Sequence, residues 1–127
     1  MKLVINEIRN LDTISSTELY CKACGLNYDF HVSDLLLHRN EIRKESLSNK
    51  FNTYSLSGDA MKHVTDFYSN CSISVHLFDI ISCYYAGQTN ATVLTDEPLI
   101  MSIADRFKVG YITMDELYNK ILMQKTG

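Results

Sequence analysis

Short apolar segments alternate with segments of helical periodicity along almost the whole chain. The apolar segments indicate strands at residues 2–5, 28–32, 51–56, 92–95 and 109–112. Helical patterns follow them, at residues 18–24, from residue 33 onward, and at 59–68, 79–86, 98–107 and 113–122. Alternating strands and helices of this length are typical of parallel strands joined by right-handed crossovers. The sequence therefore predicts a single α/β domain, residues 1–127, whose central parallel sheet has helices on both faces.

Capping signals mark where several of these helices begin. Ser33 is a typical N-cap, and Asp34 follows it in the first turn, where a carboxylate interacts favourably with the positive end of a helix. Pro98 suits the first helical position, because its missing N–H would have no partner there. Thr113 and Glu116 have the three-residue spacing of a capping box.

The helix predicted at residues 79–86 is apolar nearly all round. It opens with Asp79 and is closed by Gly87. A helix without a polar face is expected to be buried rather than to lie on the surface.

Length, charge and composition narrow the class of protein. The 127 residues, 46% of them hydrophobic, are enough for one domain with a proper core. The formal net charge of −3 gives no electrostatic footprint for duplex nucleic acid, although it allows a small site that meets phosphates through metal ions. No apolar run approaches the ~20 residues of a membrane span, and the apolar part of residues 1–10 is too short for a secretory signal. We therefore expect a cytoplasmic protein whose four cysteines are thiols.

Several polar residues follow the predicted strands, at the edge where an α/β sheet has its functional crevice. They are Asn6 and Glu7 after the first strand, Ser33 and Asp34 after the second, and Asp96 and Glu97 after residues 92–95, with Asp79 at the start of the buried helix. Carboxylates that converge on one crevice can hold Mg²⁺ or Mn²⁺, because hard cations prefer oxygen ligands. Such ions activate a water and neutralise the charge that develops on a phosphodiester.

A purely structural interpretation of the same acids is also open. Asp79 would then be a first-turn acid of its helix, and Glu97, just before Pro98, would be an N-cap with Asp96 assisting the helix dipole.

The segment from Asp79 to Glu97, with the sequence DIISCYYAGQTNATVLTDE, resembles the signature of PIN domains. In that family an Asp starts a helix, a strand follows, and a Leu-Thr turn leads to further acids. The last acid here comes eighteen residues after the first (97 − 79), as is usual in the family. The chain that follows, to residue 122, is similar to the family's closing helix–strand–helix, whereas the N-terminal part agrees in the order of its elements.

This resemblance implies a three-layer α/β/α fold with a central parallel sheet of four to five strands. It also implies a Mg²⁺- or Mn²⁺-dependent endoribonuclease, with RNA as substrate, often as the toxin of a toxin–antitoxin pair with an antitoxin protein as partner. A homodimer is common among such proteins. Asp79 matches the family's third acid and Glu97 the fourth, with Asp96 on the neighbouring position, so that Asp79, Asp96 and Glu97 are the candidate catalytic and metal-binding residues.

Two positions depart from the family pattern. The acid expected after the first strand is Asn6 here, or Glu7 if the register is one residue off, and Asn6 is counted among the candidate catalytic residues. The second expected acid falls on Arg39, and Glu41 lies on nearly the opposite helix face. These departures motivate an alternative hypothesis: a catalytically impaired PIN-fold module that binds RNA or a protein partner.

Other features received a structural interpretation. Cys21 and Cys24 have the spacing of half a zinc site, but no second pair follows, so core thiols are preferred over a small zinc-binding protein. Tyr84 and Tyr85 are interpreted as core residues rather than base-stacking residues, and His76 as a surface histidine. A solvated face is the default interpretation of the basic residues Arg39, Arg43 and Lys44, and a small patch that meets a phosphate is the alternative.

Overall fold

Five parallel strands form one sheet in the computed structural model, which describes residues 1–16, 18–43, 51–72 and 74–123. Their order across the sheet is β3-β2-β1-β4-β5. The strands are β1 (Lys2–Ile5), β2 (Asp29–Ser33), β3 (Asn52–Tyr54), β4 (Thr92–Leu94) and β5 (Tyr111–Ile112). Every strand predicted from the sequence is present, and the fold contains the expected parallel sheet.

The direction in which strands are added reverses between β1 and β4. From β1 the chain proceeds outward to β2 and β3, and then returns to place β4 against the other side of β1. Ile5 at the end of β1 is paired in register with Leu94 at the end of β4. The residues that follow these two strands therefore emerge side by side, at the point where open α/β sheets bind ligands.

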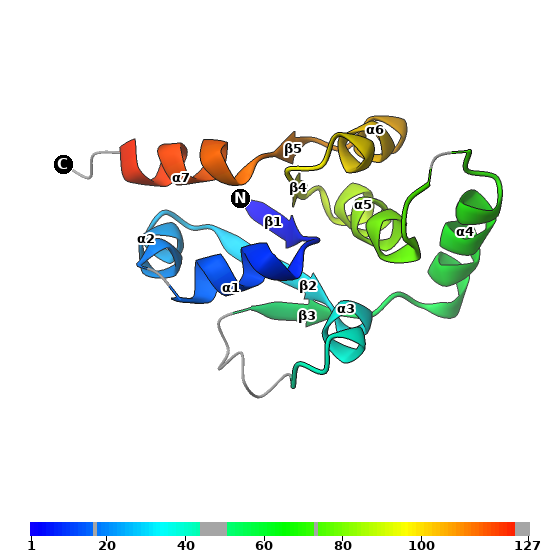
Figure 1. Cartoon of the computed structure of the whole chain (residues 1–127), viewed down its shortest axis with the longest axis horizontal. Helices are drawn as coiled ribbons and strands as arrows, with labels where there is room; N and C mark the ends of the chain where they lie inside the picture. Colours follow the sequence, from blue (N-terminus) through cyan, green and yellow to red (C-terminus); the bar gives the residue numbers. More distant parts are fainter. Residues whose placement is uncertain (17, 44–50, 73, 124–127) are drawn as a thin grey trace.

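Helices cover both faces of the sheet, which gives the predicted three layers (Figure 1). One face carries α1 (Ile8–Ser16), α2 (Leu19–Gly25), α3 (Asp34–Arg39) and α7 (Met114–Met123). The other carries α5 (Leu77–Thr89) and α6 (Pro98–Arg106), with α4 (Gly58–Ser69) packed against α5. None of the helices in the described ranges is long and apolar enough to cross a membrane.

Alternation along the central strand separates the two apolar layers. Leu3 and Ile5 of β1 are fully buried on the side of α1, α2 and α7, whereas Val4 is buried on the side of α5 and α6. Both sides of β1 are thus sealed from water. The first polar residues after it, Asn6 and Glu7, are fixed by a strand that cannot move independently of the core.

Helix α1 was not predicted from the sequence. Its residues (IRNLDTISS) include several poor helix formers, which hides the pattern. Leu11 and Ile14 are nevertheless buried three residues apart on one face of the helix. Tertiary burial therefore outweighs local propensity here.

Helix α5 is longer than predicted, because Gly87 does not end it. The helix continues to Thr89 and ends at Asn90, which adopts the left-handed conformation with φ of 56°. A Cβ atom on Gly87 would lie 3.3 Å from Cγ2 of Val109. Gly87 therefore serves close packing of the helix rather than its termination.

Candidate active site

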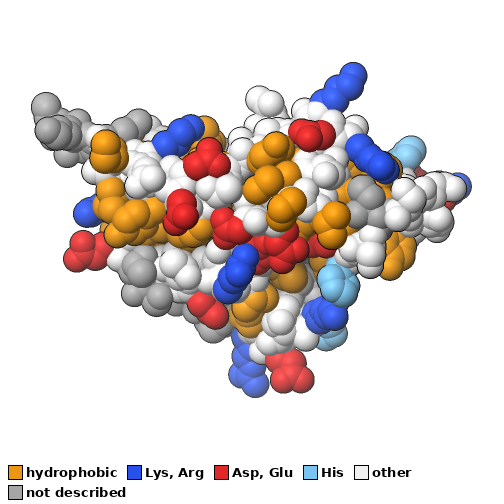
Figure 2. Space-filling view, turned by 45° about the horizontal axis from the view of Figure 1, so that its top comes forward, with side chains coloured by type: hydrophobic (Ala, Val, Ile, Leu, Met, Phe, Trp, Pro, Cys, Tyr) orange, Lys and Arg blue, Asp and Glu red, His pale blue; other side chains and the backbone are white. Residues whose placement is uncertain are grey.

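A crevice of about 410 Å³ opens where the strand order reverses. Its walls come from the β1–α1 connection, from α3, and from the first turns of α5 and α6. The lining residues are Asn6, Glu7, Ile8, Arg9, Leu36, Arg39, Asn40, His76, Phe78, Asp79, Glu97 and Ile100. Figure 2 shows one face of the molecule, on which acidic side chains gather at the centre with a basic side chain beside them.

Asp79 is held in the first turn of α5 by hydrogen bonds to both carboxylate oxygens. The backbone N–H of His76 donates to its Oδ2 (3.0 Å), and the side-chain amide of Asn6 donates to its Oδ1 (2.8 Å). The bond to His76 is a capping interaction at the positive end of the helix, as the structural interpretation anticipated. The carboxylate nevertheless lines the crevice, so capping and exposure to a ligand coexist in Asp79.

Asn6 is buried, at 5% exposure, and each end of its amide has a partner. Its Nδ2 donates to Asp79, while its Oδ1 accepts a hydrogen bond of 2.7 Å from the hydroxyl of Ser82. The carbonyl oxygen, the side-chain atom by which an asparagine could ligate a cation, therefore already accepts one hydrogen bond and is directed toward Ser82. Asn6 supplies a neutral donor to Asp79 where a carboxylate would have repelled it.

Glu7 is directed into the crevice by two neighbouring side chains. Thr95, just after β4, donates to Oε1 (3.1 Å), and Asn10 of α1 donates to Oε2 (2.6 Å). Burial raises the pKa of Glu7 above 4.5, and the nearby Glu97 carboxylate raises it further. The Thr95 hydrogen bond and the charge of Arg9 lower the pKa of Glu7, but the net shift is upward.

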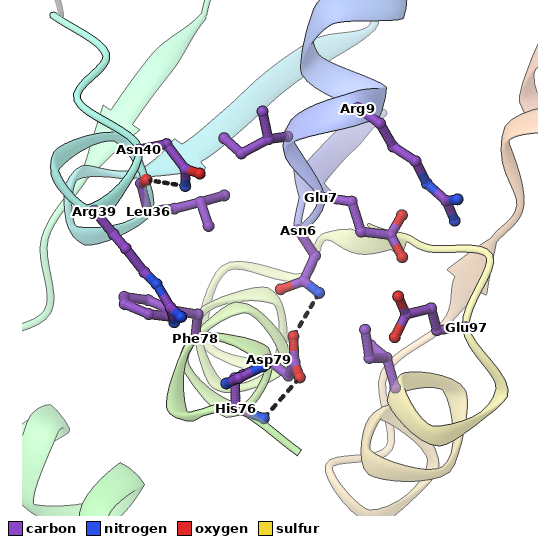
Figure 3. A pocket seen from close by; sticks show the side chains of 12 residues that line it. Asn6, Glu7, Arg9, Leu36, Arg39, Asn40, His76, Phe78, Asp79 and Glu97 are labelled. Carbon is purple, nitrogen blue, oxygen red and sulfur yellow. Dashed lines mark hydrogen bonds between the residues drawn. The ribbon is translucent and has the colours of Figure 1, made fainter.

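The Glu97 carboxylate faces that of Glu7 on the same side of the crevice (Figure 3). It is the N-cap residue of α6, but its side chain makes no capping hydrogen bond. Its backbone N–H donates instead to Oγ1 of Thr95 (3.1 Å), so that one threonine positions both glutamates. The Glu97 carboxylate is therefore not used by the helix end.

Asp96 is engaged outside this crevice. Its Oδ1 accepts a hydrogen bond of 2.9 Å from the backbone N–H of Met114, the first residue of α7. Its Oδ2 lies 3.7 Å from the guanidinium of Arg9. Asp96 does not line the crevice. Asp96 therefore links the β4–α6 turn to the start of α7.

Arg39, where the family resemblance had suggested an acid, lines the opposite side of the crevice. It is the last residue of α3, and its guanidinium carbon lies 5.2 Å from the centre of the Phe78 ring. Glu41 lies beyond the end of α3 with φ of 57° and does not line the crevice. A cation–π contact therefore occupies this side rather than a second carboxylate.

The crevice thus has two unlike walls, shown on either side of Asp79 in Figure 3. We refer to Glu7 and Glu97 as the acidic wall, and to Arg39 with Phe78 as the basic wall. Asp79 and Asn6 lie between them. In the described part of the chain, no three His, Cys, Asp or Glu side chains are grouped closely enough to hold a metal ion together.

The sequence places Glu7 at the functional edge of the sheet, and as a register alternative to Asn6, but it does not indicate the residues that position the acids. Asn10, Ser82 and Thr95 are all buried, and each bonds to Glu7 or Asn6. Of these three, Thr95 is marked in the sequence, because it belongs to the Leu-Thr turn of the family signature. Asn10 belongs to the helix that was not predicted, and Ser82 lies in an otherwise apolar run.

The cysteine prediction was wrong for one pair. Cys21 and Cys24 are exposed on α2, because the opposite face of that helix carries Leu19 and Ala23 into the core. Cys83 is buried in α5 as predicted, and burial raises the pKa of its thiol to about 12.

The sequence matches no protein-family model and, to any significant degree, no curated protein. Solved structures do match. A PilT N-terminus domain protein from the hyperthermophilic archaeon Sulfolobus solfataricus P2 is 16% identical, with a TM-score of 0.60 over 100% of this chain and 98% of that chain. The structure of VapBC-1 from nontypeable Haemophilus influenzae is 9% identical, with a TM-score of 0.62 over 88% of this chain and 96% of that chain. The chain therefore has the PilT N-terminus (PIN) domain fold, as its resemblance predicted.

Proposed function

We propose that this protein is a PIN-like nuclease that cleaves RNA with the help of one divalent cation, Mg²⁺ or Mn²⁺. One observation carries the proposal: the carboxylates of Glu7 and Glu97 face each other at the reversal point of the sheet, beside Asp79. The charge of Glu97 contributes to the raised pKa of Glu7, and a cation between the two carboxylates would offset this repulsion.

The side chains present fit one cation better than two. Glu7, Glu97 and Asp79 line the crevice, and these three residues would hold the ion once it draws their carboxylates together, because the described structure does not yet group three such side chains closely enough. The Asn6 carbonyl is bonded to Ser82, and the Asp96 carboxylate is bonded to Met114 and lies near Arg9. The set of proposed metal ligands is therefore shifted from Asp79, Asp96 and Glu97 to Asp79, Glu97 and Glu7, with Asn6 as a positioning residue.

A divalent cation, when bound, supplies a water of lowered pKa and neutralises charge on the phosphodiester. The chain itself supplies rigid placement. Thr95 and Asn10 fix Glu7, and the His76 N–H and Asn6 fix Asp79. Side chains held in this way lose little freedom when a ligand arrives, which is the form of preorganisation that catalysis requires.

Cleavage of a single-stranded RNA in the presence of Mn²⁺ tests this proposal. The wild-type protein should cleave, and Asp79→Asn, which keeps the size of the side chain but removes its charge, should cleave at least about 100-fold more slowly. Asp105→Asn, near the far end of α6, is the matched control and should be unaffected. Equal cleavage by the wild type and Asp79→Asn, or cleavage by neither, would contradict the enzymatic proposal.

A second function is favoured by the Asn6–Asp79 hydrogen bond. Because a neutral amide already satisfies one oxygen of Asp79, a binding module of the PIN fold without cleavage activity is the alternative, with RNA or a protein as its partner. Calorimetry with Mn²⁺ separates the two proposals. Binding that is absent or requires millimolar Mn²⁺ favours the module, and tighter binding that is lost in Asp79→Asn favours the nuclease.

We further propose a toxin-type role in the cytoplasm with an antitoxin protein as partner. The PIN fold and the likeness to VapBC-1 support this proposal. Induced expression of the wild type should stop bacterial growth, whereas expression of Asp79→Asn should not. A small protein encoded beside the gene should restore growth and co-purify with the chain. Light scattering of the purified protein tests separately whether two copies of the chain form a homodimer.

A further inference from the structure

Arg39 gives the crevice a positive charge that no described carboxylate neutralises by an ion pair. The ion pairs among the described side chains join Arg9 to Asp96 and Lys22 to Glu18, and neither involves Arg39. The residue is exposed and lines the crevice. A guanidinium carries five N–H donors in a planar fork, and those of Arg39 are directed into a space that a ligand can enter.

Phe78 holds this guanidinium in place. The 5.2 Å separation between Cζ and the ring centre is within the range of a cation–π contact, and it restricts a side chain that would otherwise be highly mobile. Phe78 directly precedes Asp79 in the first turn of α5, so the contact fixes Arg39 beside the acids.

We propose that Arg39 binds a backbone phosphate of the RNA strand, adjacent to the phosphodiester that the acidic wall faces. The inference rests on the proposed function for the identity of the ligand, but phosphate binding by Arg39 does not require cleavage. Arginine matches two oxygens of one phosphate with two parallel hydrogen bonds. The opposed charges of the two walls then orient the strand, since phosphates are attracted to Arg39 and repelled by Glu7 and Glu97 in the absence of a cation.

The dimensions of the crevice suit a single strand. Its 410 Å³ lies at the lower end of the roughly 300–1,000 Å³ of small-ligand sites, which is enough for about one nucleotide. The net charge of −3 also provides no extended basic surface for a duplex. The expected footprint is therefore one charged phosphate contact on a flexible strand.

Equilibrium binding of a short single-stranded RNA, measured by fluorescence anisotropy with a chelator present, tests the inference without cleavage. Arg39→Ala should weaken binding about tenfold or more, as expected for losing a hydrogen bond to a charged group. The slope of log K against log salt should fall by about 0.7, the value for one phosphate contact on a single strand. Arg39→Lys should keep the slope and bind more weakly than wild type, because it keeps the charge and loses the fork.

Arg106→Ala is the matched control, since Arg106 is also the last residue of its helix but does not line the crevice. It should leave both affinity and slope unchanged. If the role of Arg39 is purely structural, Arg39→Ala should have a lower melting temperature but an unchanged slope of log K against log salt. That outcome overturns the inference. A wild-type protein that fails to bind the RNA overturns it as well. If the wild-type protein does not cleave RNA in the Mn²⁺ assay but binds RNA through Arg39, the nuclease proposal is refuted and this inference stands.

Discussion

The two walls of the crevice are built in different ways. Glu7 follows β1 and Glu97 follows β4, and the buried Thr95 just after β4 positions both. Arg39 extends from the end of the short helix α3, with an aromatic ring as its support. The acidic wall is thus fixed by the sheet itself, whereas the basic wall depends on one exposed side chain. This difference indicates that the acids serve a step requiring accurate placement and that Arg39 serves binding.

Kinetics of Glu97→Gln and Arg39→Ala should separate the walls most strongly. Glu97→Gln removes a proposed cation ligand and should lower kcat by about 100-fold or more, with little change in KM. Arg39→Ala removes a contact made in both the ground state and the transition state, and should mainly raise KM. Steady-state cleavage of RNA with Mn²⁺ measures both constants. Equal losses of kcat in the two variants would show that the walls do not have separate tasks.

Asn6→Asp should convert the centre of the crevice into a second acidic region. A carboxylate within hydrogen-bonding distance of Asp79 should destabilise the metal-free protein by about 1–3 kcal/mol through like-charge repulsion and burial. Mn²⁺ should restore much of this stability, because a ligand that binds only the folded state stabilises it. Urea unfolding with and without Mn²⁺ measures the effect, with Asn119→Asp on exposed α7 as control. An unchanged metal response would show that Asn6 does not restrict cation binding.

Asp96→Ala tests whether neighbouring acids have different tasks. Loss of the hydrogen bond to the Met114 N–H should lower the free energy of unfolding by about 1 kcal/mol, as for other helix-start acceptors. The cleavage rate should stay within about twofold of wild type, because Asp96 does not line the crevice. Thermal unfolding and the RNA assay measure these two quantities. A rate loss as large as that of Glu97→Gln would return Asp96 to the proposed ligand set.

Glu7→Gln should have the smallest effect on the free energy of unfolding, and the part of it that depends on charge should be opposite in sign at pH 7 to the effects of Asn6→Asp and Asp96→Ala. Because the folded protein raises the pKa of Glu7 above 4.5, the stability this group contributes at low pH is lost as pH rises through the raised pKa. Removing the charge should therefore stabilise the protein at pH 7 relative to low pH by roughly a few tenths of a kcal/mol, beside a pH-independent loss of one acceptor for Asn10 or Thr95. The gain should disappear below about pH 4.5, where the acid is protonated in both states. A gain that is independent of pH would exclude charge repulsion as its cause.

The strand–helix alternation and the eighteen-residue spacing from Asp79 to Glu97 were sufficient to predict the fold from the sequence. These features are recognisable in the sequence because parallel strands need crossover connections of a minimum length and because the buried helix α5 is apolar over most of its surface. Helix α1 was not predictable, since its helical state depends on burial of Leu11 and Ile14 rather than on propensity.

The site was predictable only in part. Successive residues after a strand point in different directions, so spacing did not reveal that Glu97 enters the crevice while Asp96 turns toward α7. The same ambiguity left Asn6 and Glu7 as alternatives, although the structure brings both to the crevice with separate roles. Phe78 under Arg39 is a contact between helices distant in sequence, which no local pattern specifies.

The central claim is that the acidic wall and Asp79 together bind one divalent cation. A crystal soaked in Mn²⁺ and measured at the manganese absorption edge tests this claim most directly. We predict one anomalous peak in the crevice, in contact with carboxylate oxygens of Glu7, Glu97 and Asp79. A saturating soak that leaves the crevice without a peak, or places the manganese on Asp96, would contradict it.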